Sequence, residues 1–127
     1  MYIRYNTNPK HKRVRDCTVR AIALATGTDW DTAYIALTIH GFTMKDMPDS
    51  DAVWWDFLKE HGFEYHAIMS ECPQCVTVRE FCNEHPDGLY VIATQEHVLC
   101  AVDGDWYDIW DSGDEIVLHY WTKENVL

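Results

Sequence analysis

The residue best suited to covalent chemistry is Cys17, which follows Asp16 at the start of a helical pattern. Unpaired backbone N–H groups in the first turn of a helix carry partial positive charge, and this charge stabilises a thiolate. Arg13, Arg15 and Arg20 add positive charge to the same stretch. A cysteine with a lowered pKa is what a thiol nucleophile requires. A small buried cysteine that begins an amphipathic helix would give the same pattern.

A thiol nucleophile needs a base, and the base needs an acceptor that orients it. His97 begins an apolar strand pattern, and Asp108 follows one hairpin later. If Asp103-Gly104 forms a two-residue turn, Leu99 pairs with Asp108, which then lies diagonally from His97 on the same face. A three-residue turn would instead set Asp111 across from His97. We therefore predict Asp108 as the partner and keep Asp111 as the alternative.

The order of these features resembles the papain-like cysteine peptidase superfamily, in particular its compact bacteriocin-processing (C39-like) and transglutaminase-like members. The Asp-Cys-x-x-Arg-Ala-Ile-Ala opening at Asp16 and the Tyr-Asp-x-Trp-Asp ending at Asp111 are also similar to small phage and prophage proteins. The resemblance implies Cys17 as nucleophile, His97 as base and Asp108 as orienting acid. It further implies a hydrolase or acyl transferase that acts on an amide, peptide or thioester bond without a cofactor.

The chain departs from the superfamily at one position. Its members usually carry a glutamine about six residues before the nucleophile, where the side chain helps to hold the oxyanion, but this chain has His11. Asn8 and Gln95 are other candidate donors, and the Cys17 backbone N–H supplies one donor. Losing the second donor costs about 3 kcal/mol of transition-state stabilisation. The alternative function is therefore a catalytically silent papain-like fold that binds or inhibits a host protein.

A second cluster has the spacing of zinc ligands: Cys72, Cys75, Cys82 and His85. It would make the chain a small zinc-stabilised interaction domain. Cys82, however, also fits the buried face of a short helix, so we predict no bound metal. With five cysteines and no secretory signal, the sequence predicts thiols, thiolates or metal ligands rather than a disulfide framework.

Composition limits the classes of function. The 127 residues suffice for one domain, 1–127, and 47% are hydrophobic. The net charge of −11 argues against nucleic acid as a partner and leaves a peptide, a protein substrate or a host protein. Six of the ten basic residues lie in the first 20 positions, so residues 1–15 form a basic N-terminal segment. With no apolar run long enough to cross a bilayer, we expect a cytoplasmic protein with no membrane partner, in the host cytoplasm if phage-encoded.

The elements that would position these residues follow an α+β plan, with N-terminal helices packed on a C-terminal antiparallel sheet. Residues 1–15 carry little periodicity and are expected to be extended or looped. Helical periodicity and cap residues predict helices over 17–26, 28–41, 50–61 and 77–82. Alternation and turn residues predict strands over 63–68, 89–93, 97–102, 106–110 and 116–121.

Overall fold

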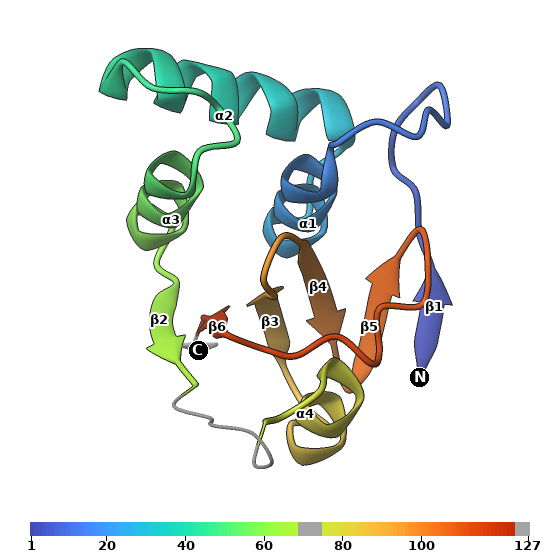
Figure 1. Ribbon diagram of the computed structural model, residues 1–127. Coiled ribbons are helices and arrows are strands. Elements are labelled where there is room, and N and C mark those ends of the chain that lie inside the picture. The colour runs from blue at the N-terminus through green and yellow to red at the C-terminus, as the bar shows by residue number, and fades with distance from the viewer. Residues whose placement is uncertain (69–74, 124–127) are drawn as a thin grey trace.

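The computed structural model describes residues 1–68 and 75–123. Within these residues the chain is an α+β fold of four helices and a six-stranded mixed sheet (Figure 1). The helices are α1 (Cys17–Thr26), α2 (Trp30–Met44), α3 (Asp51–Glu60) and α4 (Val78–Glu84). The strands are β1 (Tyr2–Arg4), β2 (Glu64–Ala67), β3 (Leu89–Ala93), β4 (Val98–Val102), β5 (Asp105–Asp108) and β6 (His119–Thr122).

The sheet order is β1-β5-β4-β3-β6-β2, and β1 runs parallel to β5 while the other neighbours are antiparallel. The prediction of a purely antiparallel sheet is therefore wrong at this edge, whereas Tyr2–Arg4 is extended, as one of the two expectations for the 1–15 segment has it. Tyr2 pairs with Trp106, and Arg4 pairs with Asp108. A strand of three residues is too short to show an alternation of polar and apolar residues in the sequence, so β1 is recognised only by its pairing with β5.

The β4–β5 hairpin has the predicted two-residue turn. Asp103 and Gly104 have φ values of 50° and 83°, and a positive φ at both central positions defines a type I′ turn. Val102 consequently pairs with Asp105, as expected. The Asp103 carboxylate also accepts a hydrogen bond from the Gly88 backbone N–H at 2.9 Å, which fixes the turn against the residue before β3.

Helices cover both faces of the sheet. The N-terminal helix α1 packs on one face, as predicted, and α4 covers the other face, which the prediction does not include. Ile22 of α1 packs with Val91 in one core cluster. Phe81 of α4 packs with Ile92 and Leu99 in a second cluster. Because successive side chains of a strand point to opposite faces, Val91 belongs to the first cluster and its neighbour Ile92 to the second. In Figure 1, α2 lies across α1 and α3 at the edge of the molecule.

The second helix is longer than its sequence predicts. Gly41 does not end it, and α2 continues to Met44 before Lys45 adopts a left-handed conformation with φ 59°. A Cβ at position 41 would lie 2.8 Å from the carbonyl oxygen of Asp46. Gly41 is therefore explained by the close return of the chain after the helix rather than by helix termination.

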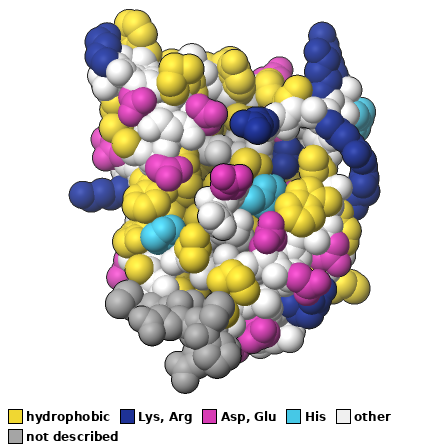
Figure 2. Space-filling model, in the orientation of Figure 1, with side chains coloured by type: hydrophobic (Ala, Val, Ile, Leu, Met, Phe, Trp, Pro, Cys, Tyr) yellow, Lys and Arg dark blue, Asp and Glu magenta, His cyan; other side chains and the backbone are white. Residues whose placement is uncertain are grey.

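Charge is unevenly spread over the surface. On the face drawn in Figure 2, Lys and Arg side chains gather mainly at the upper right, where Figure 1 places the N-terminal segment, whereas acidic side chains are scattered over the rest. Among the described residues, none of the helices combines the length and the apolar composition that crossing a bilayer requires.

Candidate active site

Cys17 is the first residue of α1, and its side chain is partly buried. Asp16 precedes it at the N-cap position, but the Asp16 carboxylate makes no capping hydrogen bond to the first turn. That carboxylate instead accepts hydrogen bonds from Trp30 Nε1 at 2.9 Å and Asn8 Nδ2 at 3.3 Å, and it pairs with Arg20. The first-turn N–H groups are therefore not satisfied by the Asp16 side chain, and the negative charge is directed away from them.

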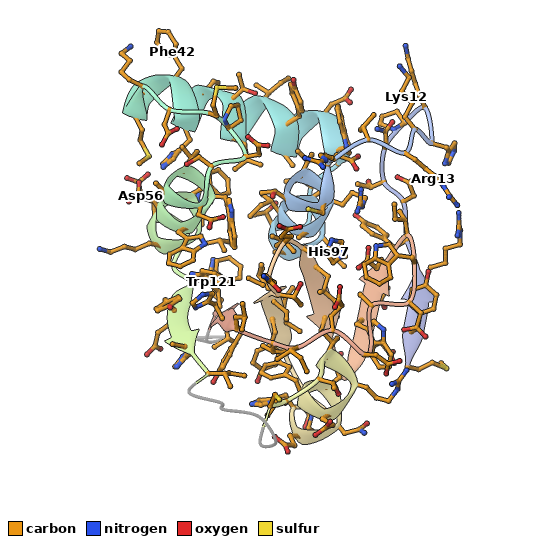
Figure 3. The ribbon with its side chains drawn as sticks, in the orientation of Figure 1. Lys12, Arg13, Phe42, Asp56, His97 and Trp121 are labelled. Carbon is orange, nitrogen blue, oxygen red and sulfur yellow. The ribbon has the colours of Figure 1, made fainter. Side chains whose placement is uncertain are left out.

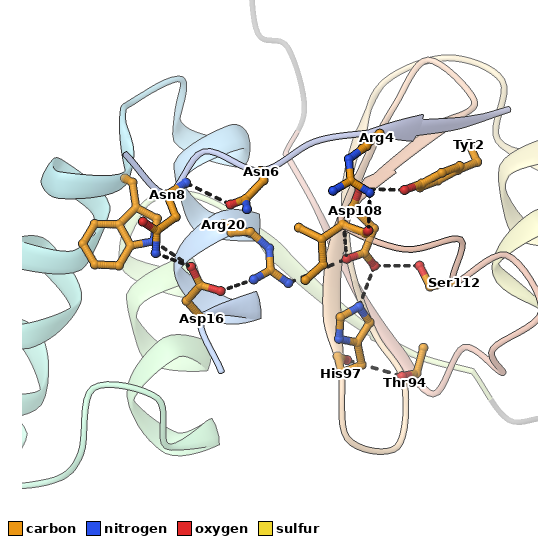
Figure 4. Close-up of polar contacts among 12 residues, drawn as sticks. Tyr2, Arg4, Asn6, Asn8, Asp16, Arg20, Thr94, His97, Asp108 and Ser112 are labelled. Atoms are coloured by element: carbon orange, nitrogen blue, oxygen red, sulfur yellow. Dashed lines mark hydrogen bonds and ion pairs between the residues drawn. The ribbon is translucent and has the colours of Figure 1, made fainter. Parts of the chain in front are cut away.

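His97 and Asp108 form a direct polar pair. His97 Nε2 lies 2.5 Å from Asp108 Oδ2 (Figure 4), and the Asp108 residue is only 2% exposed. Two further donors hold the carboxylate: Ser112 Oγ at 2.7 Å from Oδ2 and the Ile109 backbone N–H at 2.8 Å from Oδ1. The acid is therefore buried, fully engaged and aimed at one ring nitrogen of His97.

Asp111, the alternative acid, lies elsewhere. Its Oδ1 accepts hydrogen bonds from Trp106 Nε1 and the Gly113 backbone N–H, each at 3.0 Å. The hydrogen bond from Trp106 is the main reason that the pKa of Asp111 lies below its ordinary value. Asp111 also forms an exposed ion pair with Arg79. The register therefore brings Asp108, and not Asp111, to His97.

Cys17 and His97 act on each other's protonation. Burial raises the pKa of the Cys17 thiol, but hydrogen bonds to His97 and to the Val98 backbone, with the charges of His97 and Arg20, outweigh it and leave the pKa below its ordinary value. Burial likewise lowers the pKa of His97, but Asp108 and Cys17 raise it to about 9. These opposite shifts favour a thiolate–imidazolium pair. Because Nε2 is engaged by Asp108, Nδ1 is the nitrogen left for the thiol.

Arg20 connects the two acids of the site. Its guanidinium pairs with Asp16 one helical turn earlier, and its Nη2 lies 3.7 Å from Asp108 Oδ1 (Figure 4). All three side chains are at most 6% exposed. The sequence indicates Arg20 only as a positive charge near Cys17. Its spacing of four residues from Asp16 is the one sequence signal for the Asp16–Arg20 ion pair. Arg13, by contrast, is exposed and extends outward from the loop before α1 (Figure 3).

The site opens into a cleft of about 610 Å³. Cys17 and His97 line it, and Trp54 and Trp55 of α3 and Trp110 after β5 contribute aromatic surface. The cleft also has a charged rim, formed by Arg15, Asp49, Asp51 and Glu96. The cleft therefore combines aromatic and charged side chains around the thiol and the imidazole.

The candidate oxyanion donors have different positions. Asn8 is buried, and its side-chain amide is already bound to Asp16 through Nδ2. His11 is exposed and has a left-handed backbone with φ 51°. Gln95 is also exposed, but it lines the cleft with Cys17 and His97. Of the three, Gln95 is the side chain that the structure places at the cleft.

The residues considered as zinc ligands do not form a described site. Cys72 lies outside the described residues, and Cys75 is disulfide-bonded, which corrects the prediction of thiols or metal ligands at that position. An oxidised sulfur has no thiolate to offer zinc. Cys82 is buried, and burial raises its pKa to about 11. His85 stacks on Phe81, and its Nδ1 lies 2.8 Å from the Phe81 carbonyl oxygen.

One other group of metal-ligating side chains occurs within the described ranges: His40, Asp56 and Glu60. His40 Nε2 lies 2.8 Å from Asp56 Oδ2, while Nδ1 lies 3.8 Å from Glu60 Oε2. The two carboxylates face different nitrogens of the ring, so His40 links α2 to α3 through Asp56 and Glu60.

No protein-family model matches this chain, and neither a curated protein nor a solved structure matches it. The class that the fold and the site define is an α+β protein with a cysteine, a histidine and a buried aspartate at the base of an aromatic cleft.

Proposed function

We propose that this protein is a cysteine-nucleophile hydrolase or acyl transferase that acts on an amide, peptide or thioester carbonyl. The observation that carries the proposal is the buried Asp108 bound to His97 Nε2, which leaves Nδ1 for the helix-terminal Cys17. The papain-like resemblance of the sequence agrees with these roles. A peptide or protein segment is the substrate class we favour, because Trp54, Trp55 and Trp110 line the cleft together with Cys17.

In the acylation half, the Cys17 thiolate attacks the carbonyl carbon, a C–S bond forms, and the carbonyl electron pair moves to oxygen. The backbone N–H of Cys17 is one donor to this oxyanion. When the oxyanion collapses, the bond to the amine or thiol leaving group breaks, and His97 gives its Nδ1 proton to that group. The products of this half are an acyl–Cys17 thioester and a neutral His97.

In the deacylation half, neutral His97 accepts a proton at Nδ1 from water or from an acceptor nucleophile that attacks the thioester. Collapse of the second oxyanion releases the acyl product and restores the thiolate–imidazolium pair. Throughout both halves Asp108 accepts the Nε2–H hydrogen bond, which keeps one tautomer of the neutral ring and stabilises the imidazolium. Asp108 itself takes no proton.

The test is acyl transfer from an activated ester to Cys17. The full-length protein is mixed with p-nitrophenyl acetate, nitrophenolate release is followed, and intact and peptide mass spectrometry locate the acetyl group. We expect a burst with acetyl–Cys17, followed by slower turnover. Cys17→Ala should abolish the burst, and His97→Gln should slow acylation and turnover by at least about a hundredfold. His66→Gln on β2, outside the cleft lining, is the matched histidine control.

A catalytically silent binder of a host protein is the second candidate. The observation in its favour is that the Asn8 amide is bound to Asp16 and is not directed at the cleft as an oxyanion donor. In this case the Cys17 thiolate would still be acetylated, because its pKa is lowered, but the acetyl group would not be released. Substitution of Gln95 by alanine would change neither the acetylation nor the release. Turnover that falls about tenfold or more in the Gln95→Ala variant would favour the enzyme instead.

A further inference from the structure

A second, smaller hollow adjoins the cleft at His97. Its volume is about 370 Å³, and we call it the side hollow; its lining residues are Thr94, Gln95, Glu96, His97, Trp110 and Glu115. All of these residues except Glu115 also line the cleft, so the two spaces meet at the imidazole. Volumes of roughly 300–1,000 Å³ are typical of small-ligand sites. A group bound in the side hollow would therefore lie beside the proposed catalytic base.

The apolar surface of the side hollow is the indole of Trp110. This side chain is 44% exposed, and its ring centroid lies 5.1 Å from that of His97. The face of an indole is negatively polarised, and it attracts a cation that is placed over it. Because Trp110 lies against His97 and still remains partly exposed, the fold leaves an aromatic surface open next to the imidazole.

Two carboxylate side chains line the same hollow. A tight turn between β3 and β4, closed by a backbone hydrogen bond of 2.9 Å from the Thr94 N–H to the His97 carbonyl, places Glu96 directly before the imidazole. The backbone N–H of Glu115 donates to the Ser112 carbonyl at 3.1 Å. The backbone is therefore held close to both glutamates, whose side chains are exposed.

These two carboxylates have no cationic partner in the part of the chain that the structure describes. Arg79, on the neighbouring helix α4, pairs with aspartates instead. Within the described ranges, three metal-ligating side chains converge only at His40, so Glu96 and Glu115 do not belong to a set of converging metal ligands. The side hollow therefore has the charge to attract a cation without the geometry to hold a metal ion, which favours an organic cation.

We propose that the side hollow binds the lysine or arginine side chain of the substrate residue whose carbonyl is attacked. This inference rests on the proposed function, because it names the substrate class of the same site. The methylene stem of such a side chain lies along the Trp110 indole, and its charged end faces Glu96 and Glu115. The substrate is therefore a basic peptide or protein segment, and these three residues determine the specificity.

The rest of the cleft favours the same charge. Asp49 and Asp51, just before and at the start of α3, line it and are exposed. Among the described residues of the lining, Arg15 is the one arginine or lysine outside an ion pair, since Arg20 is buried in one. In Figure 2, acidic side chains flank the histidine that Figure 3 labels as His97. The carboxylates therefore outnumber the free cation, and an acidic segment would be repelled.

Acylation of Cys17 by three activated esters measures the preference. The p-nitrophenyl esters of Nα-acetyl-lysine, Nα-acetyl-norleucine and Nα-acetyl-glutamate differ mainly in the charge of the side chain. The value of kcat/KM for acylation should be about tenfold higher for the lysine ester than for the norleucine ester, and it should be lowest for the glutamate ester. The preference should decrease as salt is added, because exposed charges are screened. Cys17→Ala gives the background hydrolysis of each ester.

The double variant Glu96→Gln, Glu115→Gln tests which groups carry the preference, because it removes both charges and keeps the size of both side chains. The ratio of the lysine to the norleucine value should fall to about threefold or less. A ratio is used because a general change in acylation affects both esters alike. The matched control is Glu84→Gln, which removes an exposed carboxylate of α4 outside both spaces and should leave the ratio unchanged.

A second probe reports on the same charges without acyl chemistry. Cationic 2-(trimethylammonio)ethyl methanethiosulfonate and anionic 2-sulfonatoethyl methanethiosulfonate each form a disulfide with a thiolate and release methanesulfinate. Peptide mass spectrometry follows both reactions at Cys17. The ratio of the cationic to the anionic rate should be about tenfold higher in the wild-type protein than in the double variant, and Glu84→Gln should not change it.

The outcomes separate this inference from the proposed function. Acylation without a preference for the lysine ester, or a preference that the double variant keeps, would overturn the inference and leave the proposed function in place. If no ester acylates Cys17 but the double variant lowers the thiosulfonate ratio, the proposed function is contradicted and the cation site is supported. If no ester acylates Cys17 and the thiosulfonate ratio is also unchanged, both are overturned. Circular dichroism checks that each variant keeps its fold.

Discussion

Asp108 Oδ2 lies 2.5 Å from His97 Nε2. The two residues belong to one hairpin, and its turn residues, Asp103 and Gly104, both have a left-handed backbone conformation. The turn determines which acid the histidine meets, because side chains alternate between the faces of a strand. With one more residue in the turn, every β5 side chain would change face, and Asp108 would leave His97. The geometry of the site therefore depends on backbone conformation at two positions that do not line the cleft.

Replacing Asp108 by asparagine should lower the pKa of His97 from about 9, because the charged acceptor that stabilises the imidazolium is lost. We expect a decrease of at least about one unit. Two-dimensional NMR titration of the histidine ring measures it. Asp111→Asn should leave the His97 pKa unchanged, since Asp111 is bound to Trp106. A decrease in the Asp111 variant alone would contradict the observed register.

Cys17 should react with iodoacetamide at a lower pH than an ordinary thiol does. Its pKa lies below that of an ordinary thiol, so the thiolate persists as the pH falls below about 8.5. Cys82 and Cys100 should resist the reagent, because burial raises both of their pKa values. Peptide mass spectrometry of the native protein from about pH 5 to pH 9 resolves the three sites.

In the His97→Gln variant, the pH at which Cys17 reaches half of its maximal alkylation rate should move upward. The glutamine keeps a polar side chain but removes the positive charge that lowers the thiol pKa. An unchanged profile would show that the helix terminus alone sets the pKa of Cys17, and the pairing of Cys17 with His97 would then be contradicted.

Arg20→Gln should destabilise the fold by about 3–5 kcal/mol, because it removes the guanidinium that pairs with the buried carboxylates of both Asp16 and Asp108. Urea unfolding at neutral pH gives the free energy. The matched control is Arg79→Gln, which breaks an exposed ion pair with Asp114 and should cost at most about 1 kcal/mol. Equal losses in the two variants would show that the buried bridge contributes no more than a surface pair.

Gly104→Ala should destabilise the fold by about 1–2 kcal/mol, because φ at this position is 83° and an L-residue adopts that region at a cost. The Cβ itself would meet the Pro86 Cα at 3.4 Å, an ordinary to slightly tight contact. Thermal unfolding measures the loss. Gly27→Ala at the end of α1, with φ 67° and open space around it, is the matched control for backbone strain without a turn.

Local signals in the sequence predict much of the site. The Asp103-Gly104 dipeptide specifies its turn by conformational preference, and the turn then defines the pairing of β4 with β5. Gly27, left-handed at the end of α1, likewise sets the predicted end of that helix. The pairing of His97 with Asp108 is predicted for the same reason, because the two residues are only 11 positions apart in one hairpin.

Long-range pairings are what the sequence does not predict. The strand β1 has no period of its own, and the Asp16–Arg20–Asp108 bridge joins residues that are almost ninety positions apart in the chain. Asp16 occupies the N-cap position of α1, yet its carboxylate is held by the buried Arg20 and by the partly buried Trp30 instead of the first-turn N–H groups. Tertiary contacts therefore override a local preference where burial of a charge demands a partner.

The pairing of Tyr2 with Trp106 has a consequence for the order of synthesis. The strand that leaves the ribosome early must wait for more than a hundred further residues before its partner exists, and closing so long a loop slows folding. Cys17 waits in the same way for His97 and Asp108. A nascent or truncated chain therefore lacks the His97 and Val98 contacts that lower the pKa of Cys17, and these form only when translation has reached the last third of the sequence.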